Sequence, residues 1–597
     1  MKFFTAINIL ASTLAVQSAT LNVTDFGARG DAISITANTV TGSSVVTVQT
    51  SNALSGADIG KLMLLFGAGP ATTPTNHQDL IASIEQVNNG TNITLSLPTG
   101  ATSNDVYCTY GTQNAEAFQR CADAATGTNT IIKIPAGNYL LVPPLQVTGF
   151  EMKSGGGPVA AAVVLRKGGI RFLGEGMANT ILTGCGAWKL QGKFAHRGQL
   201  FVCQGPVTNN YPLMFEDLTM DGGMLIGNTS NHGFPASVRD GSGWDETHDA
   251  VVDRGTPPLH AFKAFRNCRF VHWRGEMLKS NSSWTNGFIE VTHCVFEDGD
   301  ASAFNFTFAH VISGCTFSNL DMAMEFYEGY MNGPSMFENS KVRDVRADLV
   351  IVGALTNHVT PAYSIRNNKL ESKDFGILLG PARNVVISSN RFSGQGFAIG
   401  TGAGYQGKDC NGNIIIEDNL FTNVGTVFLV QANGVDRMEN VVVRNNAAFK
   451  GQVFADGWGW STNISFVDNI ASGFTTGLRG MRLQGQWYLD DFSNQFPPHV
   501  ISDSVGTSNT ITYAFGRFQQ TSTSKTNSTF WIDDSKPEKI PTSAILEITH
   551  KGKCAAPLYL STTRFGVAPV TMSQDGCTIQ CAWTNGVWSV VSSNPNR

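Results

Sequence analysis

The chain has 597 residues and a formal net charge of −5 at pH 7; only 15% of its residues are charged, whereas Gly reaches 63 and Phe 37. This length exceeds what one compact core accommodates, and the composition favours a repeat solenoid of stacked strands over a helical bundle. There is no basic stripe of the kind that neutralises nucleic-acid phosphates and no uninterrupted apolar run long enough to span a membrane. We therefore exclude nucleic acid as a partner and expect no membrane span.

The first residues have the layout of a secretory signal peptide. Lys2 precedes an apolar run from about Phe3 to Val16, and the small residues Ser18 and Ala19 follow it. We therefore expect a secreted, extracellular protein whose mature fold begins near residue 20.

Several ordered motifs of the N-terminal part resemble one known family. Residues 25–31 (DFGARGD) resemble the opening signature of the pectate-lyase superfamily of right-handed parallel β-helices, which includes family-28-related glycoside hydrolases and phage tailspike-like proteins. Residues 112–122 (TQNAEAFQRCA) resemble the TxxAxQxA helix of that family, and residues 132–140 (IKIPAGNYL) and 170–176 (IRFLGEG) resemble its first two coils. The resemblance implies a scaffold that hydrolases, lyases, epimerases and inactive adhesins share, with the helix capping the open end of the solenoid.

A separate small β-domain is expected between the first two motifs. Alternating stretches such as 44–48 (SVVTV) and 92–97 (NITLSL) are separated there by Gly and Asn turns. The predicted all-β organisation is a signal peptide (1–19), the start of the β-helix (20–37), an inserted small β-domain (38–108), the right-handed parallel β-helix (109–475) and a β-rich C-terminal cap or accessory region (476–597).

One short pattern recurs and predicts the coils. It runs apolar, polar, Asn or another small residue, Cys or Asn, any residue, apolar, as in 265–270 (FRNCRF) and 365–370 (IRNNKL). With the Cys or Asn as anchor, successive copies lie 21 to 29 residues apart, which suits one β-helical turn per repeat. Stacked coils align the anchors, so we expect buried thiols and a hydrogen-bonded Asn ladder. The anchors are residues 268, 294, 315, 340, 368, 390, 419, 446 and 469.

Carboxylates gather in three successive coils and form the candidate catalytic site. Glycosidic hydrolysis needs a protonated and an ionised carboxyl within about 5 to 10 Å, a spacing that adjacent strands about 4.8 Å apart supply. Asp300 and Asp321 each lie six residues past their anchor and should stack. Glu325, between two apolar neighbours, should point outward from a strand. Asp298 and Glu276 are assisting candidates, although Asp298, beside a glycine, is an equally good turn residue.

Three functions fit this pattern. Residues 297–305 (EDGDASAFN) are similar to the coil that carries the paired aspartates of family-28 polygalacturonases, whose other motifs are not present as such. The leading prediction is a secreted glycoside hydrolase that degrades a polysaccharide, without metal or cofactor. The second is a polysaccharide lyase, because Arg274 and Lys279 place basic side chains beside the acids; calcium is expected only for this chemistry. The third is a non-catalytic carbohydrate-binding β-helix.

Aromatic and basic side chains near the acidic coils are the predicted substrate-binding residues. Sugar rings commonly stack on aromatic faces, although packing inside the fold explains any one aromatic equally well. The predicted set is Lys279, Arg274, Tyr327, Trp273 and Trp458.

Overall fold

The computed structural model describes residues 19–594 with gaps. The residues outside the description are 1–18, 50–53, 74–75, 78, 127, 143–159, 185–187, 191–192, 196–197, 204–211, 224–248, 254–261, 274, 281–287, 300, 307–308, 328–334, 353–362, 381, 402–410, 431–436, 458–459, 480–481, 484–486, 490–498, 503–507, 513–515, 522–527, 534–544, 552–557, 563–569, 573–577, 585–586 and 595–597. The predicted signal peptide up to residue 18 and three predicted site residues, Arg274, Asp300 and Trp458, therefore lie outside the described residues.

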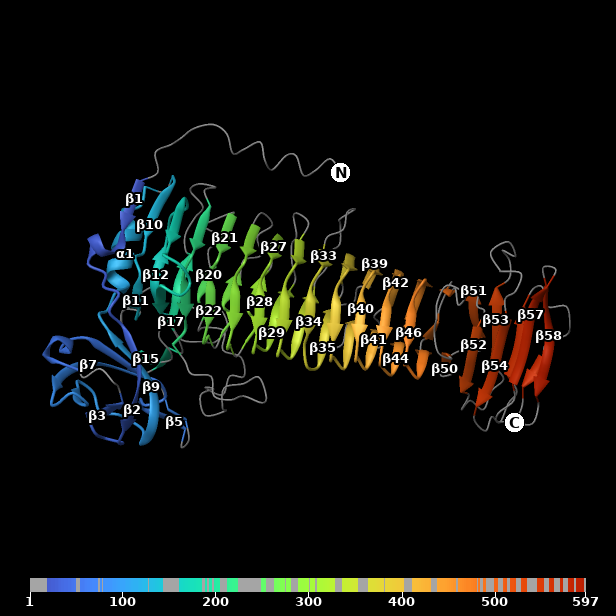
Figure 1. Cartoon of the computed structure of the whole chain (residues 1–597), viewed down its shortest axis with the longest axis horizontal. Helices are drawn as coiled ribbons and strands as arrows, with labels where there is room; N and C mark the ends of the chain where they lie inside the picture. The colour runs from blue at the N-terminus through green and yellow to red at the C-terminus, as the bar shows by residue number, and fades with distance from the viewer. Residues whose placement is uncertain are drawn as a thin grey trace. The chain divides into compact units, whose positions relative to one another are not determined.

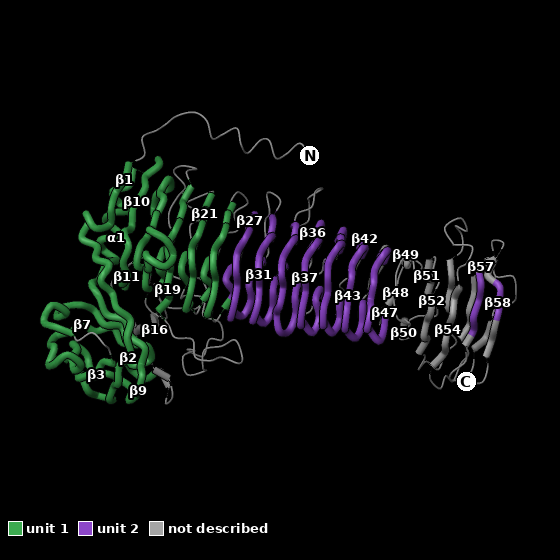
Figure 2. The backbone as a smooth tube through the Cα atoms, in the orientation of Figure 1, with its two compact units in different colours: residues 1–301 green, residues 302–597 purple. Residues whose placement is uncertain are grey.

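The fold is all-β, and three parallel sheets form a β-helix solenoid (Figure 1). We call the sheets of 19, 12 and 17 strands the first, second and third sheet. A closed antiparallel barrel of six strands is inserted near the N-terminus. The predicted fold class is thus confirmed. Two compact units, residues 1–301 and 302–597, each contain strands of all three sheets (Figure 2).

In residues 1–301 each sheet begins with a short strand that pairs in parallel with the next coil. The strands of the first sheet are β1 (Ala19–Asn22), β10 (Thr130–Lys133), β13 (Ile170–Leu173), β18 (Leu213–Glu216), β21 (Phe262–Arg266) and β24 (Phe288–Thr292). Those of the second are β11 (Gly137–Leu140), β14 (Thr180–Thr183), β19 (Thr219–Asp221), β22 (Arg269–Val271) and β25 (Val295–Glu297). Those of the third are β12 (Ala160–Leu165), β17 (Gly198–Cys203), β20 (Val251–Asp253) and β23 (Leu278–Ser280).

In residues 302–597 the strands of the first sheet are β27 (Ala309–Ser313), β30 (Ser335–Glu338), β33 (Tyr363–Arg366), β36 (Arg383–Ser388), β39 (Asn411–Glu417), β42 (Arg437–Arg444), β45 (Trp460–Val467), β48 (Arg482–Leu483), β49 (Trp487–Leu489), β51 (Ser508–Thr512), β53 (Ser528–Asp533), β55 (Leu558–Thr562) and β56 (Val570–Met572). Those of the second are β28 (Thr316–Ser318), β31 (Lys341–Arg343), β34 (Lys369–Glu371), β37 (Arg391–Ser393), β40 (Leu420–Thr422), β43 (Ala447–Phe449) and β46 (Ile470–Ser472). Those of the third are β26 (Phe304–Phe306), β29 (Met322–Tyr327), β32 (Ala347–Val352), β35 (Phe375–Leu379), β38 (Phe397–Thr401), β41 (Thr426–Val430), β44 (Val453–Gly457), β47 (Thr476–Arg479), β50 (His499–Ser502), β52 (Gly516–Thr521), β54 (Ile545–Lys551), β57 (Thr578–Thr584) and β58 (Val587–Asn594).

The end of the chain differs from the coils before it. The second sheet ends at β46, while the first and third sheets continue with parallel strands. The last pairings, β54 with β57, β57 with β58 and β55 with β56, are antiparallel.

The recurring sequence pattern builds the corner between the first and second sheets. The residue before each anchor adopts the left-handed conformation, as at Asn267 (φ 49°), Asn339 (φ 54°) and Asn367 (φ 57°). Asn tolerates this region because its short polar side chain bonds locally, so the pattern repeats for a conformational reason. The anchors follow directly and are buried.

The Asn anchors form the predicted ladder. Asn390 donates from its backbone N and its side-chain Nδ2 to Asn419 Oδ1, at 2.9 and 3.1 Å. Asn419 donates in the same way to Asn446 Oδ1, at 3.0 Å from both nitrogens. The predicted buried thiols are also confirmed, because Cys268, Cys294 and Cys315 are buried as thiols and not as disulfides.

Helix α1 (Ala115–Ala124) packs against the first coils. Its apolar face, which includes Phe118 and Ala122, is buried. The side-chain amide of Gln119 makes two hydrogen bonds to the backbone of Val164, as a neighbouring strand would. Its Oε1 accepts from Val164 N at 2.7 Å, and its Nε2 donates to Val164 O at 3.0 Å. The helix thereby pairs the edge of β12, the first strand of the third sheet, as expected of a cap.

The barrel has its own core and docks on the solenoid coils of residues 1–301. It consists of β2 (Ile33–Thr39), β3 (Val45–Gln49), β4 (Leu62–Leu65), β7 (Leu80–Val87), β8 (Asn92–Leu95) and β9 (Ser103–Gly111). An apolar cluster joins Leu64 and Phe66 of the barrel to Leu140 and Val142 of the solenoid. The remaining short elements are η1 (Val23–Phe26), η2 (Gly56–Asp58), β5 (Ala71–Thr73), β6 (Asn76–His77), β15 (Trp188–Leu190) and β16 (Lys193–Ala195).

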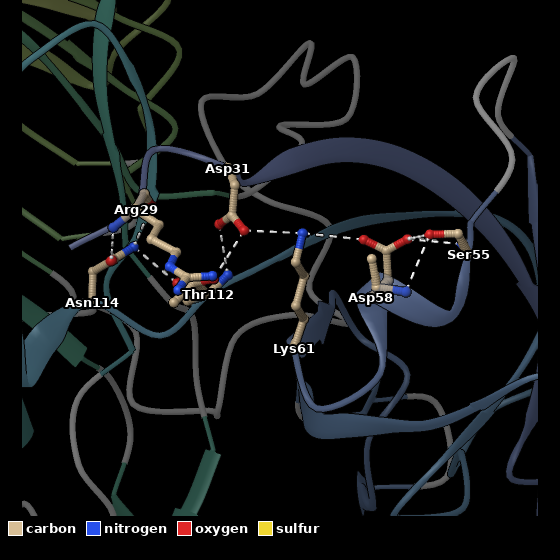
Figure 3. Close-up of polar contacts among 8 residues, drawn as sticks. Arg29, Asp31, Ser55, Asp58, Lys61, Thr112 and Asn114 are labelled. Atoms are coloured by element: carbon tan, nitrogen blue, oxygen red, sulfur yellow. Dashed lines mark hydrogen bonds and ion pairs between the residues drawn. The ribbon is translucent and has the colours of Figure 1, made fainter. Parts of the chain in front are cut away.

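Asp31 closes the neck of the barrel (Figure 3). Its carboxylate accepts from the backbone N and the hydroxyl of Thr112, both at 2.9 Å, so the residues before and after the barrel are joined. Lys61, directly before strand β4 of the barrel, bridges Asp31 at 2.9 Å and Asp58 at 3.1 Å. The last Asp of the DFGARGD motif therefore has a structural role in this chain.

Candidate functional site

Glu325 lies on the outer face of the third sheet. Its strand neighbours Met324 and Phe326 both contact Tyr363 inside the coil. Because side chains alternate along a strand, Glu325 points to the opposite, outer side. Its register partners are Asn305 and Val350. The residue is nevertheless only 7% exposed, so its carboxyl is largely shielded from water.

Asp321, directly before β29, is held by Arg346 of the following coil. Arg346 Nε donates to Asp321 Oδ1 at 2.7 Å, and Arg346 Nη2 donates to Asp321 Oδ2 at 2.9 Å. The hydrogen bond to Asp321 raises the pKa of Arg346, and the charges of Asp321, Asp374 and Glu325 act in the same direction against the effect of burial. Glu325 therefore lies within electrostatic reach of this ion pair.

Arg346 was not among the predicted site residues, although the sequence carries a signal for it. Arg346 lies six residues past the anchor Ser340, as Asp321 lies six residues past Cys315. Residues at this position of adjacent coils do meet, as Asp321 and Arg346 show. Arg274 and Asp300 have the same spacing from Cys268 and Cys294, and both lie outside the described residues.

A half-buried aromatic pair continues the same face. Phe375 and Phe397 are stacked in register, with centroids 5.4 Å apart and an interplanar angle of 5°. The Arg346 guanidinium carbon lies 5.4 Å from the Phe375 centroid. Both rings pack on an outer apolar cluster that includes Val350 and Leu378. The aromatic residues near the Asp321–Arg346 ion pair thus lie on β35 and β38. Neither Phe375 nor Phe397 was among the predicted substrate-binding residues.

Glu276 and Lys279 form a buried ion pair in residues 1–301. Lys279 Nζ lies 3.0 Å from Glu276 Oε2, and the two side chains are 4% and 10% exposed. Lys279 is in register with Val252 of β20. An ammonium group this well shielded requires its carboxylate partner, so Lys279 is not a solvated surface residue.

Asp298 has a structural reason to be Asp. It follows β25 with φ 52°, and its carbonyl oxygen accepts from His272 N at 2.9 Å. Residues that follow second-sheet strands elsewhere, such as Asn319 and Asp344, have the same left-handed conformation. This geometry supports the turn interpretation of Asp298 that the sequence left open.

Trp273 does not offer a face to a sugar. It is fully buried, and its indole nitrogen donates to Met220 O at 3.0 Å. The prediction of Trp273 as a substrate-binding residue is therefore wrong. Its ring fills the core of the fold and is not available to stack on a sugar. Only the backbone of Tyr327, at the end of β29, is described.

A histidine–aspartate pair beside Trp273 was also missed. His272 Nδ1 lies 2.9 Å from Asp221 Oδ1. Burial lowers the pKa of His272, but the hydrogen bond and the charge of Asp221 raise it overall. The two residues are far apart in sequence, so no local pattern could reveal the pair.

Within the described residues, no group of three or more His, Cys, Asp or Glu side chains is arranged to hold a metal ion. In the same part of the chain, no helix is long and apolar enough to span a membrane.

No family model matches the sequence, and no curated protein matches it. Solved structures of right-handed parallel β-helices do match. The tailspike protein of E. coli bacteriophage HK620 in complex with a pentasaccharide is 12% identical, with a TM-score of 0.42 over 86% of this chain and 96% of that chain. The catalytic domain of a GH87 α-1,3-glucanase in complex with nigerose is 11% identical (TM-score 0.39; 79% and 100%). The mannuronan C-5 epimerase AlgE4 A-module of Azotobacter vinelandii is 13% identical (TM-score 0.39; 63% and 94%).

Proposed function

We propose that the chain is a secreted glycoside hydrolase that cleaves a polysaccharide lying on the outer face of the third sheet. One observation carries the proposal: a carboxyl shielded from water, Glu325, lies on that face within electrostatic reach of the Asp321–Arg346 ion pair. Glycosidic hydrolysis requires two carboxyl groups, and a carboxyl shielded from water is suited to the role of the acid.

In this proposal Glu325 is the general acid. It donates a proton to the glycosidic oxygen as the bond to the anomeric carbon breaks, so that the leaving sugar departs as a neutral alcohol. Asp321 is a positioning residue, because Arg346 engages both of its oxygens. The base that activates water stays the sequence prediction Asp300, on its spacing from Cys294.

The test is a pair of amide variants measured on a panel of neutral and acidic polysaccharides. Glu325→Gln and Asp300→Asn should each lower the release of reducing ends by about 10²-fold or more, as expected for a lost acid or base. Asp344→Asn is the matched control, because Asp344 is exposed and Asn is equally suited to its left-handed turn. Products should carry one added water by mass. Full activity of both amide variants would show that catalysis lies elsewhere.

A polysaccharide lyase is the second candidate, and the buried Lys279–Glu276 pair favours it. A lyase base removes the proton beside a uronate carboxylate, and a shielded lysine is suited to proton transfer. This reaction gives an unsaturated, ultraviolet-absorbing product without added water. Such a product, lost in Lys279→Met, would replace the hydrolase proposal; a chelator would then test the need for calcium.

A further inference from the structure

A buried acid in the interior of the coils has no role in the proposed reaction. Asp348 lies on β32 and is fully buried. Its Oδ2 lies 3.0 Å from Ser372 Oγ and 3.3 Å from Gln395 Nε2. These three residues come from three successive coils and are all buried. Within the described part of the chain, Asp348 Oδ1 and Gln395 Oε1 have no hydrogen-bond partner.

Counting hydrogens shows that this group cannot satisfy a carboxylate. Ser372 has a single hydroxyl hydrogen, and its Oγ lies 2.6 Å from the carbonyl oxygen of Phe375, which can only accept. That hydrogen is therefore committed to Phe375. The 3.0 Å contact between Ser372 Oγ and Asp348 Oδ2 is a hydrogen bond only if the hydrogen comes from Asp348.

Gln395 is only a weak hydrogen-bond donor to an ionised Asp348 carboxylate. Its Nε2 donates to Leu370 O at 2.7 Å, which fixes the orientation of the amide. Its second hydrogen reaches Asp348 Oδ2 only at 3.3 Å, a weak contact. An ionised, fully buried carboxylate with one weak donor is strongly disfavoured, whereas a neutral acid fits these contacts.

We propose that Asp348 is a neutral acid in the folded chain, donating its proton to Ser372 Oγ, and that this proton joins three coils of the solenoid. The loss of the proton then weakens the stack locally, because it creates a buried charge whose one donor, Gln395 Nε2, is weak. The inference is independent of the proposed hydrolase activity.

The surroundings agree with this assignment. Burial raises the pKa of Asp348 to about 8, and its contacts with Ser372 and Gln395 oppose this only in part. Glu371 is the charged residue whose field reaches Asp348, and it too raises the pKa; its own partner is Lys369, at 2.8 Å. A folded-state pKa above the ordinary value means that the folded chain binds the proton more tightly, so this contribution to stability falls as the pH rises from about 4 to about 8.

Infrared difference spectroscopy of the whole chain tests the proposal. Ordinary carboxyls are ionised by about pH 6, so a protonated-carboxyl C=O band that disappears between about pH 6 and pH 10 reports a buried neutral acid. We expect such a band, and expect Asp348→Asn to remove its largest part. Asp374→Asn, an exposed acid of the next coil, should leave the band unchanged. A spectrum without a band sensitive to Asp348→Asn would overturn the proposal.

Hydrogen exchange gives the structural readout. After correction for intrinsic rates, protection of β32, β35 and β38 should fall by about tenfold or more between about pH 6 and pH 9 in the natural chain, and stay constant in Asp348→Asn. If Asp348→Asn does not fold, Ser372→Ala replaces it: removal of the proton acceptor should shift the midpoint of the infrared titration. An unshifted midpoint would contradict the assignment.

Discussion

Arg346 holds Asp321 with two hydrogen bonds of 2.7 and 2.9 Å that cross from one coil to the next. The backbone N of Arg346 also donates to Asp321 O at 3.0 Å. The two hydrogen bonds from the forked guanidinium of Arg346 therefore add to this backbone hydrogen bond. Together they fix the direction of the Asp321 carboxylate, near Glu325. Lysine cannot reproduce this fork, because its ammonium is a single point charge.

Arg346→Lys should therefore disturb the site more than the fold. We expect a loss of about 1 to 2 kcal/mol in unfolding free energy and, if the proposed function holds, a fall in kcat with little change in KM, because Asp321 loses its fixed orientation. Chemical denaturation and steady-state kinetics measure the two effects. Glu116→Gln, which removes an exposed ion pair with Arg120, is the control and should cost about 0.5 kcal/mol or less. An Arg346→Lys variant as stable and active as the natural chain would show that the fork is dispensable.

The sequence predicted the coils because their signal is local and repeated. Each copy must place a left-handed residue such as Asn367 before a buried anchor such as Asn368, so the same chemistry returns in every turn. The spacing from the anchor also led to Asp321, whose stacking position is shared with Arg346. Export and the catalytic roles stay predictions.

Other features depend on contacts that no local pattern encodes. Trp273 looks like a sugar platform in the sequence, yet it fills the core, because composition cannot tell an aromatic that packs from one that binds. The pairing of His272 with Asp221 and the docking of Phe66 near Gly223 join distant segments. The surroundings of Asp348 are Ser372 and Gln395, which come from the next two coils.

Asn419→Ala should be among the most destabilising single changes in the coils. The variant leaves the backbone N and Nδ2 of Asn390 without their acceptor, and removes the donor to Ile387 O. Each buried polar group that loses its partner costs about 1 to 3 kcal/mol, so we expect a total of roughly 3 to 5 kcal/mol. Thermal unfolding measures the loss.

Asn413→Gly is the control for the ladder. Asn413 lies in an exposed Asn row, where its Nδ2 donates to Asn384 at 3.1 Å, and glycine keeps its positive φ without strain. This change should cost about 1 kcal/mol or less. Equal effects of the two variants would mean that the buried ladder adds nothing beyond the exposed one.

The neck of the barrel should open in acid. Burial raises the pKa of Asp31, but hydrogen bonds from Thr112 and the Lys61 ammonium lower it overall below its ordinary value of 3.8. A depressed folded-state pKa stabilises the fold above the ordinary value, and this contribution is lost as the pH falls through the folded-state pKa. Hydrogen exchange of β2 and β9 should therefore rise below about pH 4 in the natural chain. Asp31→Asn should show faster exchange already at neutral pH and little further change in acid; a parallel pH response in both chains would refute the clamp.

Gly223 permits the docking of the barrel, and its substitution separates steric contact from backbone strain. Gly223 has φ +70°, and an added Cβ would lie 2.9 Å from Phe66 Cζ. Gly394 has φ +87° with nothing within 4 Å, so Gly394→Ala carries the strain of a left-handed alanine, about 1 kcal/mol, without the clash. Gly223→Ala should lower the free energy of unfolding by more than Gly394→Ala does, and should raise hydrogen exchange in β4 and β9. Gly394→Ala should leave hydrogen exchange in these two strands unchanged. Adding Phe66→Leu to Gly223→Ala removes the clashing atom and should restore part of the protection, as a steric cause requires; no recovery in the double variant would assign the whole effect to the backbone.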